Sequence, residues 1–315
     1  MTGLFSLIKR NSKLFFRDKG MFFSALITPI ILLVLYATFL ANIYRDSFTS
    51  SMPEAMEVSK RLINATVGGQ LFSSLLAVSC VTVAFCCNML MVQDKVSGAR
   101  RDLTVSPVRP STLALGYYIA TLLSTLLVCL VACAACLIYM ACVGWYLSFG
   151  DVLCLCLDVF LLVMFGTALS SIINFFLNSQ GQISAVGTVV SAGYGFICGA
   201  YMPISQFGAG LQRVLSFLPG TYGTSLLRNH ALAGVYREMA DIGFPSEVIG
   251  GIRDSIDCNL YFFGHRVSTG AMYLILAASV ILLIGIYVLL CILPGRGRRF
   301  GRRHNTNPSK NRQLP

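Results

Sequence analysis

The sequence predicts an all-α integral membrane protein with six transmembrane helices, an N-terminal amphipathic helix and a re-entrant outer segment. Hydrophobic residues make up 56% of the 315 residues and charged residues only 12%, about half the charged share of a soluble domain. The apolar residues come in blocks of about 20 or more, the length that a helix needs to cross a bilayer. Backbone in lipid must satisfy its own hydrogen bonds, and the alternating pattern of a barrel is not seen, so these blocks are expected to be helices.

The N-terminal residues 1–20 are expected to form a separate amphipathic helix. Between Leu4 and Lys19, apolar side chains are mixed with five basic ones. This mixture is typical of a helix that lies in the membrane interface, and a simple basic flank of the first span is the alternative. The first apolar block is longer than the 7–15 residues of a signal-peptide core, so we interpret it as a span.

The membrane domain is expected over residues 21–293. Its six apolar blocks lie at about 21–43, 67–92, 112–141, 152–177, 183–201 and 271–293. The fifth is the least regular because it contains four glycines. Two of these, Gly195 and Gly199, have the small-x-x-x-small spacing that allows close helix contact, although they could equally add only local flexibility.

Two polar excursions separate these blocks on the predicted outer side. The first covers residues 44–66. The second, 203–270, contains an amphipathic run, Phe207–Leu218, and the run after Pro219 is too short to span a bilayer. The segment 203–270 is therefore predicted to contain a re-entrant helix pair or a helix that lies in the outer interface.

The distribution of charge predicts that both termini are cytoplasmic. Segments on the side of the termini carry 16 of the 24 basic residues, and most of the acidic residues fall on the opposite side. The net charge of +11 is explained by this topology. The basic tail, 294–315, directly follows a span and is interpreted as an anchor on anionic lipid, with nucleic-acid binding as the disfavoured alternative. We expect a multi-pass protein of the cell (plasma) membrane.

Residues that could catalyse ATP hydrolysis are missing from the sequence. A phosphate-binding loop needs a Gly-Lys pair, and the chain contains none. We therefore expect no ATP, no other cofactor and no catalytic residue on this chain.

The twelve cysteines predict packing rather than metal binding. Cys133 and Cys136 form a formal C-x-x-C, but with Cys129 they share one face of an apolar helix, where cysteine behaves as a small apolar residue. The usual ligand spacings are absent, and the three histidines, His230, His265 and His304, are scattered in sequence.

One acid lies well inside an apolar block. Asp158 is seven residues after Asp151, near the outer start of the fourth block. A buried charge in a membrane usually has a function, so Asp158 is a candidate pore or interface acid. The alternative is an acid near the interface that reaches water or caps a neighbour.

A resemblance to a known family comes from the charged inner loop 93–111 and from two later motifs. The loop contains an acid, a glycine and a Leu-x-x-Ser-Pro-Val step, and the outer segment contains Gly199–Ser205 and a Leu-Pro-x-x-Tyr step followed by Arg228. Together with Phe15–Asp18, these motifs resemble the membrane subunit of type-2 ABC transporters. The family acid is usually glutamate, and here it is Asp94.

The resemblance implies a fold of six spans preceded by a connecting helix, with two such halves pairing above two separate ATPase subunits that bind ATP and Mg. It places the ATPase-coupling loop at Asp94, Gly98, Arg100, Arg101, Leu103, Ser106 and Pro107. It places the outer gate at Gly199, Pro203, Pro219, Tyr222 and Arg228.

The resulting functional prediction is an exporter permease for a drug, antibiotic or lipid-like substrate. The Ser-Pro-Val and Leu-Pro steps look closer to the drug and antibiotic branch of the family. Two alternatives stay open: a permease for polysaccharide or lipid-linked glycan, and a non-transporting membrane sensor or immunity protein. The second permease half could be an identical or a related chain, and membrane lipids are the other expected partners.

Overall fold

The computed structural model describes residues 2–36, 38, 45, 59–105 and 108–293. The end of the first apolar block, most of the loop 44–66, Ser106, Pro107 and the basic tail 294–315 therefore lie outside the described residues. The described part is almost entirely helical, which confirms the predicted all-α membrane fold.

The helices follow the predicted order along the chain. They are α1 (Thr2–Arg17), α2 (Lys19–Leu35), α4 (Lys60–Cys87), α5 (Met89–Val96), α6 (Ala99–Val105), α7 (Pro110–Val143), α8 (Phe149–Phe176), α9 (Gln180–Ile197), α10 (Ala209–Leu215), α11 (Pro219–Ala231), α12 (Ala233–Asp241), α13 (Ser246–Ser255) and α14 (Thr269–Ile292). A 3₁₀ turn, η2 (Ile204–Gln206), precedes α10, and a hairpin of β1 (Tyr261–Phe262) and β2 (His265–Arg266) precedes α14.

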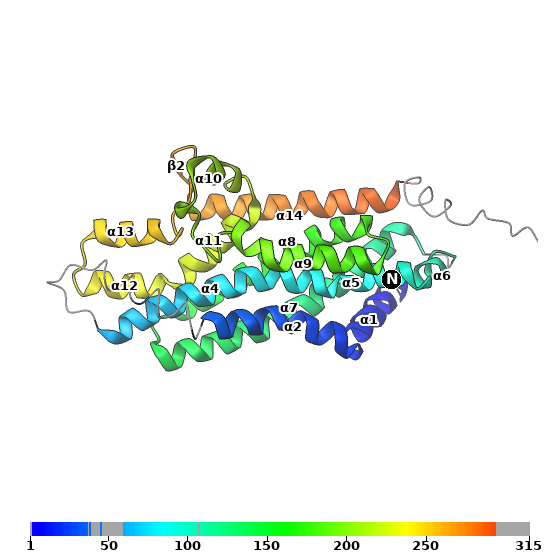
Figure 1. The fold of residues 1–315 in the computed structure, drawn as a ribbon, viewed down its shortest axis with the longest axis horizontal. Helices are drawn as coiled ribbons and strands as arrows, with labels where there is room; N and C mark the ends of the chain where they lie inside the picture. Colours follow the sequence, from blue (N-terminus) through cyan, green and yellow to red (C-terminus); the bar gives the residue numbers. More distant parts are fainter. Residues whose placement is uncertain (1, 37, 39–44, 46–58, 106–107, 294–315) are drawn as a thin grey trace, which may run out of the picture.

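The long helices run side by side along the longest axis of the molecule (Figure 1). Helix α6 lies at one end with α1, and α12 and α13 lie at the other (Figure 1). We call these the α6 end and the α12 end. Helix α4 is almost wholly buried, because α2, α7, α8, α9 and α11 all pack against it. Its apolar residues point in all directions, as expected for a helix in the centre of a bundle.

The described residues contain fewer clear spans than the sequence predicts. Four stretches are long and apolar enough to cross a membrane: Lys60–Val96, α7, α8 and α14. Helices α1 and α2 qualify only together, as a pair bent by 75°. Helix α9 has only 18 residues, and its glycines, serines and glutamines make it less apolar than the four clear spans. Length and composition therefore give four spans, or five with the bent pair, against the predicted six.

Helix α1 has the amphipathic character predicted for the N-terminus. Leu7, Asn11 and Phe15 are buried on one face, at intervals of four residues, while Lys9 and Lys13 are exposed on the other. The chain then turns at Asp18, whose carboxylate accepts a hydrogen bond from the Met21 amide and caps α2.

The segment predicted to be re-entrant contains more than one pair of helices. Helix α10 is followed by α11, which begins at Pro219 and inserts between α4, α8 and α14 with nearly every side chain buried. Helices α12 and α13 add a second apolar cluster at the α12 end, which includes Leu62, Val235 and Met239. The segment 203–270 is thus a small folded unit that the bundle holds through α11.

The cysteines Cys129, Cys133 and Cys136 lie buried in the main hydrophobic core. This placement agrees with the packing role that their helical spacing predicts.

Candidate functional site

Three clusters of buried polar side chains lie along the bundle, and each joins helices that are far apart in the sequence. The first surrounds Asp94 near the α6 end, the second surrounds Asp158, and the third surrounds Arg228 in α11. Burying a charge is costly unless it is paired and hydrogen-bonded, so these clusters fix how the helices sit relative to one another.

The Asp94 cluster ties α5 to α1 and α7. The buried carboxylate accepts hydrogen bonds from Arg10 Nη1 at 2.7 Å, from Arg10 Nη2 at 3.1 Å and from the Tyr117 hydroxyl at 2.5 Å. Arg10 comes from the amphipathic helix α1 and Tyr117 from α7. The sequence singled out Asp94, but neither of its partners.

Lys95 extends this connection to α8. Its ammonium donates hydrogen bonds to the backbone carbonyls of residues 174, 175 and 177 at 3.0, 2.6 and 3.0 Å. These carbonyls end α8, where a helix has unpaired acceptors and a negative dipole end. The consecutive residues Asp94 and Lys95 therefore connect α5 to three other helices.

Helix α6 follows directly and presents its polar side chains outward. Gly98 has a φ of +86° that a side chain would strain, and it turns the chain from α5 into α6. Arg101 is exposed, Arg100 is half-buried, and Leu103 packs partly against the apolar cluster around Tyr117. Every residue of α6 keeps some exposure.

The Asp158 cluster joins α8, α11 and α14. Asp158 is only 1% exposed; one carboxylate oxygen lies 2.6 Å from His230 Nδ1, and the other accepts a hydrogen bond from the Tyr273 hydroxyl at 2.5 Å. Both carboxylate oxygens of Asp158 are therefore paired with side chains of other helices. Asp151, seven residues earlier, caps α8: it closes the capping box with Ser148 and pairs with Arg237.

His230 gives this cluster a predicted dependence on pH. Burial alone lowers the pKa of His230, but the hydrogen bond and charge of Asp158 outweigh burial and raise the pKa above its usual value of 6.5. The pair should thus stabilise the fold fully below about pH 6.5, and this stability should be lost as the pH rises through the higher folded-state pKa. Thermal unfolding of the detergent-solubilised chain across this range checks the prediction.

The control is Asp158→Asn, which removes the charge that raises the pKa of His230. This variant should show a flatter dependence of the unfolding temperature on pH. A wild-type unfolding temperature that does not fall as the pH rises through this range contradicts the prediction.

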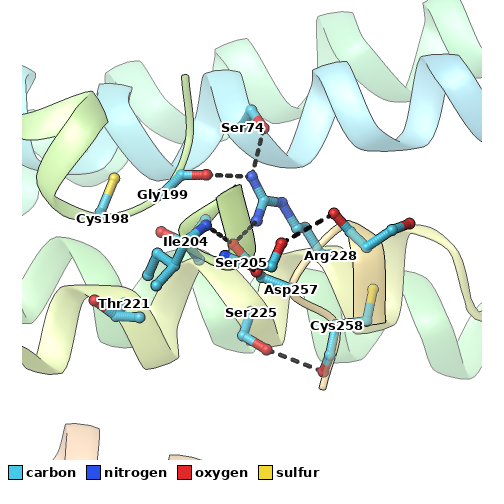
Figure 2. Close-up of polar contacts among 12 residues, drawn as sticks. Ser74, Cys198, Gly199, Ile204, Ser205, Thr221, Ser225, Arg228, Asp257 and Cys258 are labelled. Atoms are coloured by element: carbon cyan, nitrogen blue, oxygen red, sulfur yellow. Dashed lines mark hydrogen bonds and ion pairs between the residues drawn. The ribbon is translucent and has the colours of Figure 1, made fainter. Parts of the chain in front are cut away.

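The Arg228 cluster is shown in Figure 2. Arg228 is the largest fully buried side chain, at 1% exposure. Its guanidinium donates to the Gly199 carbonyl at 2.5 Å and to Ser74 Oγ at 3.3 Å, and lies 3.4 Å from an Asp257 carboxylate oxygen (Figure 2). It thus connects α11 to α4, to the end of α9 and to the segment after α13.

Asp257 carries the connection on to η2. Its carboxylate accepts hydrogen bonds from the backbone amides of Ile204 and Ser205, the latter at 3.1 Å. Gly199 permits this arrangement because its φ is +75° and a Cβ there would lie 2.9 Å from Ile204.

The structure brings the predicted gate residues into one region. Pro203 directly precedes η2, Pro219 is the first residue of α11, and the Tyr222 hydroxyl donates to the Ser216 carbonyl at 2.6 Å. A Cβ at Gly195 would meet the Tyr201 ring of the same chain at 2.3 Å. Gly195 thus makes room for the residues that follow it.

The residues that the sequence analysis missed are the partners of the buried charges. Ser74, Asp257, His230 and Tyr273 showed no motif of their own. The sequence offered only a general indication that such partners exist: a buried arginine or aspartate needs an opposite charge or a hydrogen-bond partner nearby.

The apolar helical bundle defines an integral membrane protein. Buried hydrogen bonds and ion pairs join its helices at several levels along the bundle. Residues 2–231 match the family described as ABC-2 type transporter. The match covers nearly three quarters of the chain and includes α1 through α11. The chain therefore belongs to the ABC-2 type transporter family, as its motifs indicated, and is an ABC transporter permease subunit. A search of the curated proteins found no match.

Proposed function

We propose that the chain is one membrane half of an exporter that a separate ATPase drives. The observation that carries the proposal is the Asp94 cluster, which connects the exposed helix α6 to three helices of the bundle. Two ATPase subunits, carrying ATP and Mg, would dock on α6, and both termini would lie on that same, cytoplasmic side of the plasma membrane.

In this proposal, movement at α6 is transmitted through these contacts. A displacement of α6 would move α5, to which it is joined at Gly98. Helix α5 is hydrogen-bonded to α1 and α7 through Asp94, and to α8 through Lys95. Side-chain pairs of this kind transmit displacement because packed helices move as units. At the other end, α8 is bound to α11 through Asp158 and His230, so the same movement reaches the proposed outer gate.

The second permease half would cover helix α9. A Cβ added at Gly181 or Gly193 would meet nothing within 4 Å, and the same helix exposes Ser184 and Thr188. Small residues of this kind favour close helix packing in membranes. The proposed assembly has two permease halves and two ATPase subunits.

The substrate proposed from the motifs is a drug, an antibiotic or a lipid-like molecule. The Ser-Pro-Val and Leu-Pro steps, at Ser106–Val108 and Leu218–Pro219, support this branch over the export of polysaccharide. A neighbouring gene for an ATPase would agree with the proposal, and a surrounding cluster of glycosyltransferase genes would favour polysaccharide instead.

Charge reversal on α6 tests the docking. The chain is purified from its native membrane in mild detergent, and the mass and ATPase activity of the complex are measured. The wild-type complex should contain two permease chains and two ATPase subunits. Arg101→Glu should reduce the co-purified ATPase activity about tenfold, since a reversed charge at an interface repels its partner.

The matched control is Arg266→Glu, an exposed arginine in β2, which should retain the activity. Because Arg101 is exposed, its variant should unfold at the wild-type temperature. The proposal fails if no ATPase subunit co-purifies with the wild-type chain, or if both reversals reduce the activity equally.

A further inference from the structure

A cleft of about 570 Å³ lies between α10, the start of α11 and the β-hairpin. This volume is within the range of ligand sites, about 300–1,000 Å³. Its wall includes Asp254, Asn259, Arg213 and the ring of Tyr261. The wall also includes Asp257, Ile204 and Ser205, so the cleft borders the Arg228 cluster.

The first observation is a set of acceptors on one side of the cleft. The Asp254 carboxylate accepts hydrogen bonds from Asn259 Nδ2 at 2.7 Å and from the Tyr261 hydroxyl at 3.1 Å. Both donors reach the same carboxylate oxygen, Oδ1. Within the described part of the chain no hydrogen bond reaches the other oxygen, Oδ2, so the exposed Asp254 carboxylate suits a ligand that donates N–H groups.

The second observation is an opposite charge elsewhere on the same wall. Arg213 is exposed in α10, and within the described part of the chain it forms no ion pair with Asp254. The cleft thus presents a free guanidinium together with a carboxylate, and this combination is complementary to a zwitterion.

The third observation is an exposed apolar surface beside the cleft. Val214 of α10 and Phe217, two residues after α10 ends, are exposed, as is Phe263 at the tip of the hairpin. The Phe217 ring stands edge-on to the rings of Phe262 and Phe263, at centroid distances of 5.2 and 6.0 Å. Apolar surface of this kind marks a contact with another molecule or with a membrane.

The hairpin tip has an unusual conformation that supports such a contact. Phe263 has a φ of +47° and Gly264 a φ of +84°, as in a two-residue turn of type I′. A bulky residue at positive φ is rare, and asparagine or glycine would fit better. Keeping phenylalanine here costs stability and places an aromatic ring at the surface.

The fold puts this surface beside the first residues of a candidate span. The membrane-spanning helix α14 begins at Thr269, three residues after β2 ends. Figure 1 shows α10 and β2 beside the start of α14. Aromatic side chains are enriched at this level of membrane proteins. The apolar surface therefore lies beside the start of a candidate span.

We propose that this cleft binds the headgroup of a zwitterionic phospholipid, with its ammonium at Asp254, its phosphate at Arg213 and its acyl chain over Phe217 and Phe263. A primary ammonium, as in phosphatidylethanolamine, can donate hydrogen bonds to the Asp254 carboxylate and a quaternary one cannot, so the primary ammonium binds better. The inference does not depend on coupling to an ATPase, because the readout is binding alone.

The test measures binding of short-chain phospholipids to the purified full-length chain by titration calorimetry. Phosphatidylethanolamine should bind with a dissociation constant about tenfold lower than phosphatidylcholine or phosphatidylglycerol. Asp254→Asn and Arg213→Gln should each weaken its binding about tenfold, as expected for the loss of one charged hydrogen bond. Glu247→Gln, on the same helix as Asp254 but outside the cleft, should bind as the wild type does.

The Phe263→Asn variant distinguishes the contribution of the acyl chain to binding from that of the headgroup. It suits the turn, so the variant should fold, yet it should weaken binding of the lipid while leaving that of soluble phosphoethanolamine unchanged. The proposal is overturned if Asp254→Asn and Arg213→Gln bind with the wild-type constant, or if phosphatidylglycerol binds as tightly as phosphatidylethanolamine. It is also overturned if soluble phosphoethanolamine binds as tightly as the lipid.

Discussion

The Arg228→Met variant should unfold with a free energy about 3–5 kcal/mol lower than that of the wild-type chain, which is the usual cost of breaking a buried ion pair. Methionine fills much of the same space but leaves the Asp257 carboxylate buried without its cation. It also removes the donors to Ser74 and Gly199. Denaturant titration of the detergent-solubilised chain, followed by circular dichroism, measures the loss.

Two further variants separate the charge effect from the change of shape. Arg228→Met with Asp257→Asn should recover part of the loss, because neither charge then remains buried and unpaired. Arg237→Met is the surface control: its guanidinium pairs with Asp151 but is half exposed, so its loss should cost about 1 kcal/mol or less. An Arg228→Met variant within about 1 kcal/mol of the wild type contradicts this account of the cluster.

In the Asp94→Asn variant, the ATPase activity that depends on the membrane subunit should be about tenfold lower than in the wild type. Asparagine keeps the shape of Asp94 but removes the charge that holds Arg10 of α1 and weakens the bond from Tyr117. The effect on stability should be smaller than at Arg228, because the Arg10 side chain is 32% exposed and water screens the pair. Activity of the complex in nanodiscs, together with an unfolding curve, measures both effects.

Asp94→Glu is the matched control, since it keeps the charge and adds one methylene. It should retain most of the activity, because the resembling family usually has glutamate here. Arg10→Gln should reproduce the defect of Asp94→Asn, and the double variant should be little worse than either single one. Additive losses in the double variant would show that the two residues act independently.

The sequence predicted the helices better than the contacts between them. Apolar blocks around α4, α7, α8 and α14 are long enough that composition alone identifies them. Helix α9 was harder to predict as a span, because its glycines and polar residues make it less apolar than the clear spans. The long segment after α9 was harder still, since its helices are short and are held by packing on the bundle.

The candidate sites were predicted only in part, for a related reason. Motifs identified Asp94 and Arg228, and an acid inside an apolar block identified Asp158. Their partners lie far away in sequence: Arg10 is 84 residues from Asp94, and Tyr273 is 115 residues from Asp158. A single sequence shows that a buried charge needs compensation, but only the packing of the helices decides which residue supplies it.

The most direct test of the central claim is a cross-link from α6 to a nucleotide-binding subunit. Val105 is 83% exposed in α6, so a Val105→Cys variant can carry a photo-cross-linker in native membranes, and an ATP analogue then labels the polypeptide that is captured. We predict an ATP-labelled adduct from Val105→Cys and none from Val214→Cys in α10, near the opposite end of the bundle. An adduct from Val214→Cys, or no ATP-labelled adduct from Val105→Cys, would contradict the account.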